Sequence, residues 1–360
     1  MKHWKPPTKG HFSTLILVFS FCILASYGTI KPIQASPNDA DQQRLNLLSE
    51  ALRNSASFKV RCTAAVALGR LGTPAAVDAL IYSMQVDQHY AVRGASAKSL
   101  GRVQHKSAVG PLLAQLNDEE TLVRNAAESS LRQFHSSEYL SEFEAGLDYP
   151  NPMIRRAAVE AFTKVLSSGE QRAGRAVLHA SNDNDTVISS MSRATLNDLS
   201  DELIHPILID GLSDDSSDIR RTAALLLAQQ PSPTAVKPLV GALTRTGEQE
   251  HVYSAVKKGL LSHKEYMDLP TLRKQAKNDD VTDERIKSLR ILGAIKDTQA
   301  VPLVQSALRD GNADVRVAAA RSAIDSEDPQ LEESLTAAIA SEKNDRVRRH
   351  MTLMRKTAKF

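Results

Sequence analysis

Aromatic residues are scarce in this sequence. They make up 4% of the 360 residues, and the single tryptophan is Trp4. The chain is nevertheless 42% hydrophobic, which is enough to bury a large core. That core must therefore be built mainly from Ala, Leu, Val and Ile. The length alone corresponds to about two ordinary domains.

The first 35 residues differ from the rest of the chain. Lys2, Lys5 and Lys9 precede an apolar run at residues 12–30, and Ala35 supplies the small residue of a cleavage site. This layout predicts a secretory signal peptide over residues 1–35, so the mature chain would be exported and periplasmic or extracellular. The alternative is an uncleaved membrane anchor formed by residues 12–30.

Removal of this leader would change the composition. Four of the 45 basic residues are lysines of residues 1–35, which leaves 41 basic and 42 acidic residues. A nearly neutral mature chain without tryptophan does not predict binding to nucleic acid. Cys22 would leave with the leader, and Cys62 alone cannot form an intramolecular disulfide. We interpret Cys62 as a helix-packing residue rather than a nucleophile.

A Val-Arg or Ile-Arg pair recurs along the chain, at first with a period of about 31 residues, and such a period is typical of a solenoid. The pairs are Val60-Arg61, Val92-Arg93, Val123-Arg124, Ile154-Arg155, Ile219-Arg220, Val315-Arg316 and Val347-Arg348. Small residues, often an alanine pair, follow at a fixed offset. Each unit predicts a short first helix, with apolar residues at i, i+3, i+4 and i+7, and a second helix that carries the Val-Arg pair.

The glycines of "ALGRLGTPAAV" at residues 67–77 are expected to separate two helices. Gly69 and Gly72 would close one helix before Thr73-Pro74 begins the next. A phosphate-binding loop would need a preceding strand and a terminal Lys-Ser or Lys-Thr, and both are missing. Over residues 40–357 the pattern predicts about ten helix pairs and no β-strand.

We therefore expect an all-α fold, an α-solenoid coiled as a right-handed superhelix, over residues 36–360. The last unit, from about residue 341, is strongly basic and has no successor. Terminal repeats must present a polar outer face to water, so we expect this unit to act as a cap.

The unit resembles a HEAT repeat of the short type also called PBS-lyase HEAT-like, with Val before Arg, an Ala pair after it and Asp six residues before it. The resemblance implies a general binding scaffold and a structural ladder, in which the turn aspartate pairs with the arginine of the next helix. The matching positions are Asp87 with Arg93, Asp118 with Arg124, Asp214 with Arg220 and Asp310 with Arg316. Asp148 and Arg155 are one residue further apart.

Three units depart from this pattern. The fifth has Val187-Ile188, the seventh has Val252-Tyr253, and the eighth is irregular around Ile286, so each is predicted to lack the ladder arginine. Two interpretations stay open, namely sequence drift in a tolerant array or a specialised site.

Enzymes built on this scaffold form the main alternative. Deoxyhypusine hydroxylases of the HEAT type bind di-iron through His-Glu pairs, and none of the ten histidines here is followed by glutamate. Phycobilin lyases resemble the repeat as well, but they act on cytosolic pigment proteins. We expect no cofactor, no bound metal and no catalytic residue, with an enzyme or lyase-type subunit related to PBS-lyase HEAT-like proteins as the alternative.

The predicted function is an exported, non-enzymatic scaffold that binds a protein or peptide partner. Its surface would be the concave face lined by the second helices. The candidate partner-binding residues are Lys98, Arg102, Asn125, Ser129, Arg156, Glu160 and Lys164.

Charge is also uneven along the chain. Residues 181–218 hold nine acids and one base, whereas residues 343–359 hold seven bases and one acid. This asymmetry could orient a partner along the array. The basic C-terminus or the leader could instead allow membrane contact.

Overall fold

The structure is a computed structural model that describes residues 37–166, 169–278 and 280–357. Within these residues the chain forms twenty α-helices and no β-strand. The predicted signal peptide at residues 1–35, with its apolar run at residues 12–30, lies outside the described residues. None of the described helices combines the length and the apolar character needed to cross a bilayer.

The chain divides into two compact units, residues 1–47 and residues 48–360. In the first unit the described residues are 37–47, which form the beginning of helix α1. The second unit contains the end of α1 and all later helices.

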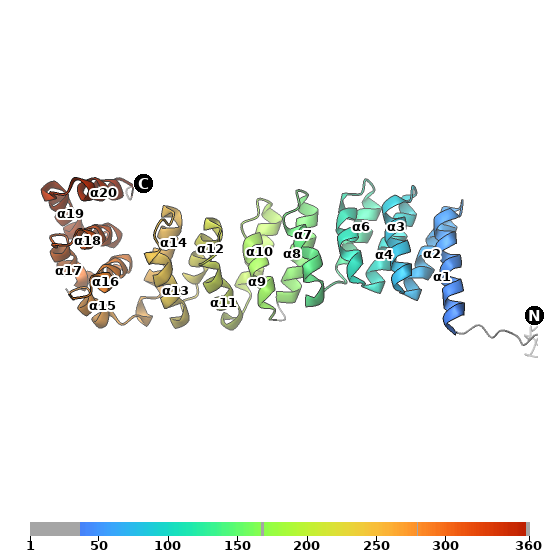
Figure 1. Cartoon of the computed structure of the whole chain (residues 1–360), viewed down its shortest axis with the longest axis horizontal. Helices are drawn as coiled ribbons and strands as arrows, with labels where there is room; N and C mark the ends of the chain where they lie inside the picture. Colours follow the sequence, from blue (N-terminus) through green and yellow to red (C-terminus); the bar gives the residue numbers. More distant parts are fainter. Residues whose placement is uncertain (1–36, 167–168, 279, 358–360) are drawn as a thin grey trace, which may run out of the picture. The chain divides into compact units, whose positions relative to one another are not determined.

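The helices alternate between a first and a second helix of each repeat, which gives ten pairs along the described chain (Figure 1). The first helices are α1 (Pro37–Asn54), α3 (Pro74–Val86), α5 (Val109–Ala114), α7 (Leu140–Leu147), α9 (Gln171–Ala180), α11 (Asp201–Gly211), α13 (Pro233–Thr244), α15 (Leu269–Gln275), α17 (Val301–Ala307) and α19 (Pro329–Ser341). The second helices are α2 (Phe58–Leu71), α4 (Tyr90–Val103), α6 (Thr121–Leu131), α8 (Pro152–Leu166), α10 (Thr186–Asn197), α12 (Ser217–Leu227), α14 (Glu250–Ser262), α16 (Thr282–Ala294), α18 (Ala313–Ser326) and α20 (Asp345–Thr357). The predicted all-α solenoid of about ten helix pairs is confirmed.

Local capping chemistry explains where several helices begin. Thr73 accepts a hydrogen bond from the backbone N–H of Ala76 at the start of α3. Asp185 accepts from the N–H groups of Val187 and Ile188 at the start of α10. Such caps satisfy N–H groups that have no partner inside the helix. Five 3-10 segments lie beside the helices, at Lys106–Ala108, Gln115–Asn117, Ser137–Tyr139, Lys264–Tyr266 and Thr298–Ala300.

Second helices make the largest contacts between neighbouring repeats, but two first helices, α9 and α11, make the main contact between the fifth and sixth repeats. From α4 onward each second helix also contacts the first helix of its own repeat, and the most extensive contacts between second helices are α2–α4, α4–α6, α12–α14 and α16–α18. Small side chains allow this approach. The alanine pairs after the Val-Arg positions are buried: Ala64, Ala65, Ala126, Ala127, Ala157, Ala158, Ala223, Ala224, Ala319 and Ala320.

The two glycines of residues 67–77 have different roles. Gly72 has a φ of 61° and donates its N–H to the Leu68 oxygen, so it caps α2 as predicted. Gly69 does not end the helix, because it lies inside α2 against Ser99 of α4. A Cβ on Gly69 would be 2.6 Å from the Ser99 Cβ. The same contact of glycine with serine joins Gly101 to Ser130 and Gly293 to Ser322.

We expect Gly101→Ala to lower the free energy of unfolding by about 1–3 kcal/mol, the usual cost of overpacking. The added methyl group would lie 2.6 Å from the Ser130 Cβ and 2.7 Å from its Cα. Urea unfolding measures the loss. Gly110→Ala in α5 is the matched control, since a Cβ there meets no atom within 4 Å. Equal stability of the two variants would contradict the close approach of α4 and α6.

Candidate functional site

The ladder arginine of a second helix, four residues after the N-cap, can bind both its own repeat and the next one. Arg93 of α4 shows how. Arg93 Nη1 donates to the backbone oxygen of Asp87, at 3.0 Å. Its Nε and Nη2 donate to the carboxylate of Asp118 in the next repeat, at 2.7 and 2.9 Å. The Arg93 and Asp118 side chains are only 9% and 8% exposed, so the pair is nearly buried as well as charge-assisted.

This geometry corrects the predicted pairing of Asp87 with Arg93. The Asp87 carboxylate accepts instead from Arg61 of the preceding repeat and from the N–H of His89. At the N-terminus of α4, Asp87 is thus bound by Arg61 and by the N–H of His89. Arg93, one turn later, binds the following repeat. In the predicted pairs Asp118 with Arg124, Asp214 with Arg220 and Asp310 with Arg316, the arginine likewise binds the backbone oxygen of the aspartate.

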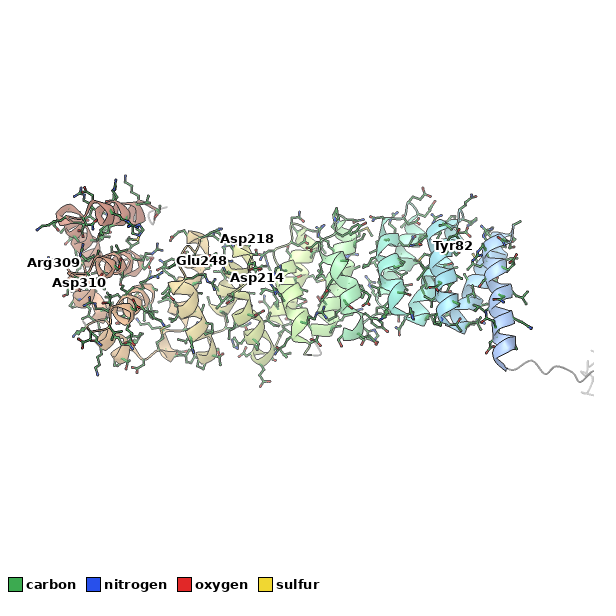
Figure 2. All side chains as sticks on the ribbon, in the orientation of Figure 1. Tyr82, Asp214, Asp218, Glu248, Arg309 and Asp310 are labelled. Carbon is green, nitrogen blue, oxygen red and sulfur yellow. The ribbon has the colours of Figure 1, made fainter. Side chains whose placement is uncertain are left out.

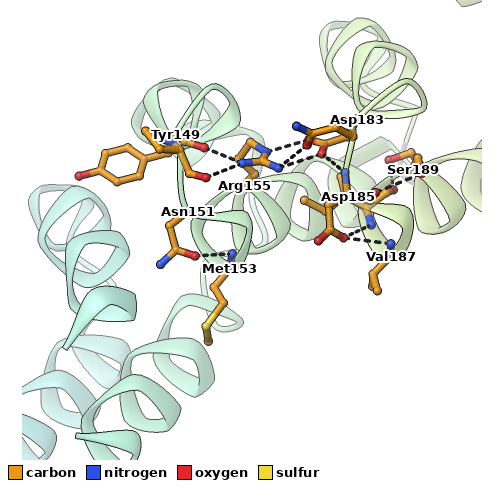
Figure 3. A network of polar contacts seen from close by, with 12 residues as sticks. Tyr149, Asn151, Met153, Arg155, Asp183, Asp185, Val187 and Ser189 are labelled. Atoms are coloured by element: carbon orange, nitrogen blue, oxygen red, sulfur yellow. Dashed lines mark hydrogen bonds and ion pairs between the residues drawn. The ribbon is translucent and has the colours of Figure 1, made fainter. Parts of the chain in front are cut away.

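In the described part of the chain, five other arginines at the ladder position bind a carboxylate of the following repeat. The pairs are Arg61–Asp87, Arg155–Asp183, Arg220–Glu248, Arg285–Asp310 and Arg316–Glu342. Figure 3 shows one rung: the guanidinium of Arg155 lies between the backbone oxygen of Tyr149 and the carboxylate of Asp183. The ladder therefore connects repeats to one another, which gives these arginines a structural role.

The eighth repeat has a ladder arginine that the sequence pattern missed. Arg285 follows the N-cap Val281 by four residues, as the other ladder arginines follow theirs, and it binds Asp310 at 3.1 Å. Our prediction that this unit lacks the arginine is wrong, because Ile286 follows the arginine instead of preceding it. The spacing of 25 residues to the acid, the same as for Arg93, is the signal that could have found it.

The fifth repeat does lack the arginine, since Ser189 stands at that position, four residues after the N-cap Asp185. The acid left without a ladder arginine is Asp214, which Figure 2 labels next to α12. The first helix α9 supplies the missing donors, with His179 Nε2 at 2.8 Å and Arg175 Nη2 at 3.2 Å from the Asp214 carboxylate. The ladder is thus continued there from the first helix.

A further break follows Arg124. This arginine donates to the backbone oxygens of Asp118 and Glu119 and to Thr121 Oγ1. In the next repeat Asn151 caps α8 with its side chain, and Tyr149 lies two residues before it. Other repeats have an acid at the position of Tyr149, so Arg124 finds no carboxylate there. Asp148, which the sequence placed near the pattern, is not a partner of Arg155.

Two of the ladder arginines, Arg220 and Arg155, lower the pKa values of the acids that they bind. Hydrogen bonds from Arg220 lower the pKa of Glu248 to about 2, and those from Arg155 lower the pKa of Asp183. At Glu248 and Asp183, burial acts in the opposite direction and is weaker than these hydrogen bonds. Because the folded pKa is depressed, this stabilisation is complete above the unfolded pKa, and it is lost as the pH falls through the folded value.

The predicted partner-binding residues fall into two groups. Lys98 and Arg102 of α4 and Asn125 and Ser129 of α6 are exposed. None of the four makes an ion pair or side-chain hydrogen bond with another described residue. They remain available to a partner.

Arg156, Glu160 and Lys164 are engaged within the protein. Arg156 binds Glu128 at 2.9 Å, and Arg132 binds Glu128 at 2.8 Å and Glu160 at 3.4 Å. Lys164 Nζ donates to the backbone oxygen of Arg132 at 3.2 Å. These side chains connect α6 to α8, so a partner would have to displace contacts between repeats.

A groove with a volume of about 550 Å³ lies among the second helices α14, α16, α18 and α20. Cavities of this size commonly hold small molecules or short peptide segments. Apolar and charged side chains share the lining: Ile286, Val317, Ala318 and Met354 with Arg245, Glu250, Arg290, Asp314 and Arg321.

The groove uses the helix face that the sequence predicted, but in later repeats. Arg290 and Arg321 each lie nine residues beyond the N-cap of their helix, as Lys98 and Ser129 do in α4 and α6. That a partner binds this face stays a prediction, and the repeat pattern gave no signal for which repeats form a cavity.

A buried carboxylate fixes one side of the groove. Asp325 of α18 is 1% exposed and accepts from Tyr253 Oη at 2.6 Å, Lys257 Nζ at 2.9 Å and Arg321 Nε at 3.2 Å. Tyr253 and Lys257 belong to α14, so these contacts join the seventh repeat directly to the ninth. Tyr253 stands at the ladder position of the seventh repeat, and the departure from the pattern therefore serves this contact.

Arg321 completes the cluster. Its guanidinium carbon lies 3.8 Å from the centroid of the Tyr253 ring, a cation–π contact, and its Nη atoms bind Glu250 at 2.7 and 3.1 Å. Burial raises the pKa of Tyr253, which keeps the phenol protonated as a donor to Asp325.

The described part of the chain offers few groups suited to metal binding or nucleophilic catalysis. It contains no cluster of three or more His, Cys, Asp or Glu side chains suited to a metal ion. Burial raises the pKa of the Cys62 thiol, which reduces the thiolate that a nucleophile needs.

The last helix, α20, packs on α18 and α19. Its exposed side chains include Arg346, Arg348 and Arg349, so the final unit presents a basic, polar surface.

Comparisons with solved structures give likenesses of low identity. Human deoxyhypusine hydroxylase is 18% identical over 80% of this chain and 97% of its own, with a TM-score of 0.31. The CpcE–CpcF complex of phycocyanin lyase from Nostoc sp. PCC7120 is 20% identical over 70% and 94%, with a TM-score of 0.28. Kap121p bound to Nup53p is 14% identical over 89% and 41%, with a TM-score of 0.34. Values this low say nothing about what the present chain binds.

A search of curated proteins gives no match. A family model described as HEAT repeats matches residues 45–132 and 269–354. These segments cover α2 to α6 and α15 to α19, in which the ladder arginines recur. These two segments therefore match HEAT repeats, and the fold of the described chain is an all-α solenoid.

Proposed function

We propose that this chain is an exported, non-enzymatic scaffold that binds a protein or peptide partner in the groove among α14, α16, α18 and α20. The observation that carries the proposal is the open groove itself, about 550 Å³ in volume and lined by four second helices and residues 245–248. The contacts of Asp325 tie two of those helices together, so the groove is preformed. The leader pattern of residues 1–35 supports export.

A peptide segment suits this site better than a compact ligand. Successive second helices present a row of side chains across the repeats, and solenoids use such rows to bind extended partners. An extended segment crossing α16 and α18 would place its side chains against Ile286 and Val317. HEAT repeats by themselves do not specify a function, so the site has to be tested directly.

We expect Val317→Trp to fill the groove and weaken peptide binding by at least about tenfold, roughly 1.4 kcal/mol. The probe is a peptide selected from a displayed random library on the purified chain, and fluorescence anisotropy measures its affinity. Asn125→Trp is the matched control, because Asn125 and Val317 both lie five residues beyond the N-cap of a second helix.

Three results would contradict the proposal. The library could give no binder, or the two tryptophan variants could bind the selected peptide equally well. Turnover of a substrate by the purified chain would instead favour the enzyme or lyase-type alternative.

A further inference from the structure

Three arginines line the groove, and two of them are already paired with acids. Arg245 binds Glu248 at 3.2 Å, and Arg321 binds Glu250 at 2.7 Å. Arg290 of α16 instead donates to the backbone oxygen of Leu243. It forms no ion pair with a carboxylate in the described part of the chain. Arg290 is thus the arginine of the groove whose charge is not paired with a described carboxylate.

Arg290 is also held in place. Its guanidinium carbon lies 5.7 Å from the centroid of the Tyr253 ring, and Tyr253 is itself fixed by Asp325. A guanidinium has five N–H donors, and the bond to Leu243 uses one. A cation held in this way loses little conformational freedom when a carboxylate binds to its remaining donors.

The apolar side chains that line the groove determine which ligand groups can bind next to a carboxylate held by Arg290. Ile286, Val317, Ala318 and Met354 give the groove an apolar surface beside Arg290. Aliphatic side chains of a ligand would bury area there. Hydrogen bonds to a charged group are also stronger where water is excluded.

We propose that Arg290 makes the groove selective for a peptide segment in which an Asp or Glu side chain is flanked by aliphatic residues. This inference rests on the proposed function, since it specifies the partner of the same groove. The acid binds the free donors of Arg290, and the aliphatic neighbours pack on α16 and α18.

Three acids line the groove, and Glu248 is compensated by Arg220 and Arg245. The other two restrict where the ligand carboxylate can lie. Glu250 is bound by two nitrogens of Arg321, so its charge is largely compensated. Asp314 is exposed in the first turn of α18 and forms no ion pair with another described residue. It would repel a nearby carboxylate, so Asp314→Asn should strengthen binding of an acidic peptide about twofold.

The test uses fluorescein-labelled, C-terminally amidated peptides with one central position, flanked by random mixtures of Ala, Val, Leu and Ile. The central residue is Glu, Gln, Lys or phosphoserine. We expect the full chain to prefer Glu over Gln by about tenfold, the scale of a charge-assisted hydrogen bond. In Arg290→Gln this preference should disappear. In Arg309→Gln, at an exposed arginine after α17 that does not line the groove, it should persist.

Each outcome decides between the claims. Equal binding of the Glu and Gln peptides to the unchanged chain overturns the inference even if Arg290→Gln fails to fold. Survival of the preference in a folded Arg290→Gln overturns it as well. Stronger binding of phosphoserine that depends on Arg290 replaces the carboxylate with a phosphopeptide. If peptides bind without regard to charge and Val317→Trp abolishes binding, the proposed function stands and only this inference fails. If no peptide binds, the proposed function fails too.

Discussion

Asp325→Ala should lower the free energy of unfolding by about 3–5 kcal/mol, the range found when one partner of a buried ion pair is removed. Asp325 is 1% exposed and accepts from Tyr253, Lys257 and Arg321. Without it, two cations and a phenol lose their shared acceptor. Urea unfolding of the purified variant measures the effect.

Asp345→Ala is the control for this prediction. Asp345 also lies in a second helix and pairs with an arginine, Arg348, but its side chain is 72% exposed. Exposed pairs contribute about 0–1 kcal/mol, so this variant should unfold almost like the unchanged chain. If both variants have the same stability, Asp325 does not hold the seventh and ninth repeats together.

The Asp325 variant also connects stability to function. The contact from α14 to α18 crosses the eighth repeat and fixes one side of the groove. Where Asp325→Ala remains folded at low temperature, its affinity for the peptide should fall, although Arg290 and the other side chains that line the groove are unchanged. Unchanged affinity would mean that the groove forms without this contact.

The periodic part of the fold could be predicted from the sequence because it depends on local contacts. Val-Arg pairs and alanine pairs recur wherever a second helix packs on its neighbour, so their spacing identified the helix pairs. The family model leaves out residues 133–268, the stretch that contains Ser189 and Tyr253 in place of ladder arginines. Helix pairs continue there nonetheless, since the apolar stripes persist without the arginine.

The groove and the direction of the ladder depend on contacts between repeats, which periodicity does not contain. The resemblance to HEAT repeats implied a pairing of Asp87 with Arg93, six residues later, within one repeat. The carboxylate of Asp118, 25 residues later, is the actual partner. The contact of Tyr253 with Asp325 spans 72 residues, and it depends on how three repeats pack together.

Arg93→Ala should lower the free energy of unfolding by about 3 kcal/mol or more, because it leaves the nearly buried carboxylate of Asp118 without its cation. Arg124→Ala is the matched control, since Arg124 lies at the same position of the next second helix but binds no carboxylate. Its bonds go to backbone oxygens and Thr121, so about 1–2 kcal/mol is expected.

The difference between these two variants should depend on pH in one direction. Burial raises the pKa of Asp118, but the hydrogen bonds from Arg93 and from the N–H of Glu120, together with the charges of Arg93 and Arg124, lower it by more. The stabilisation by Arg93 is therefore complete above the unfolded pKa of an aspartate, about 3.9, and it declines as the pH falls through the folded value. Unfolding measured between pH 7 and pH 2 should show the excess cost of Arg93→Ala shrinking toward acid. If Arg93→Ala and Arg124→Ala lose the same free energy of unfolding at pH 7, or if the difference between them does not change with pH, then Arg93 does not bind the carboxylate of Asp118.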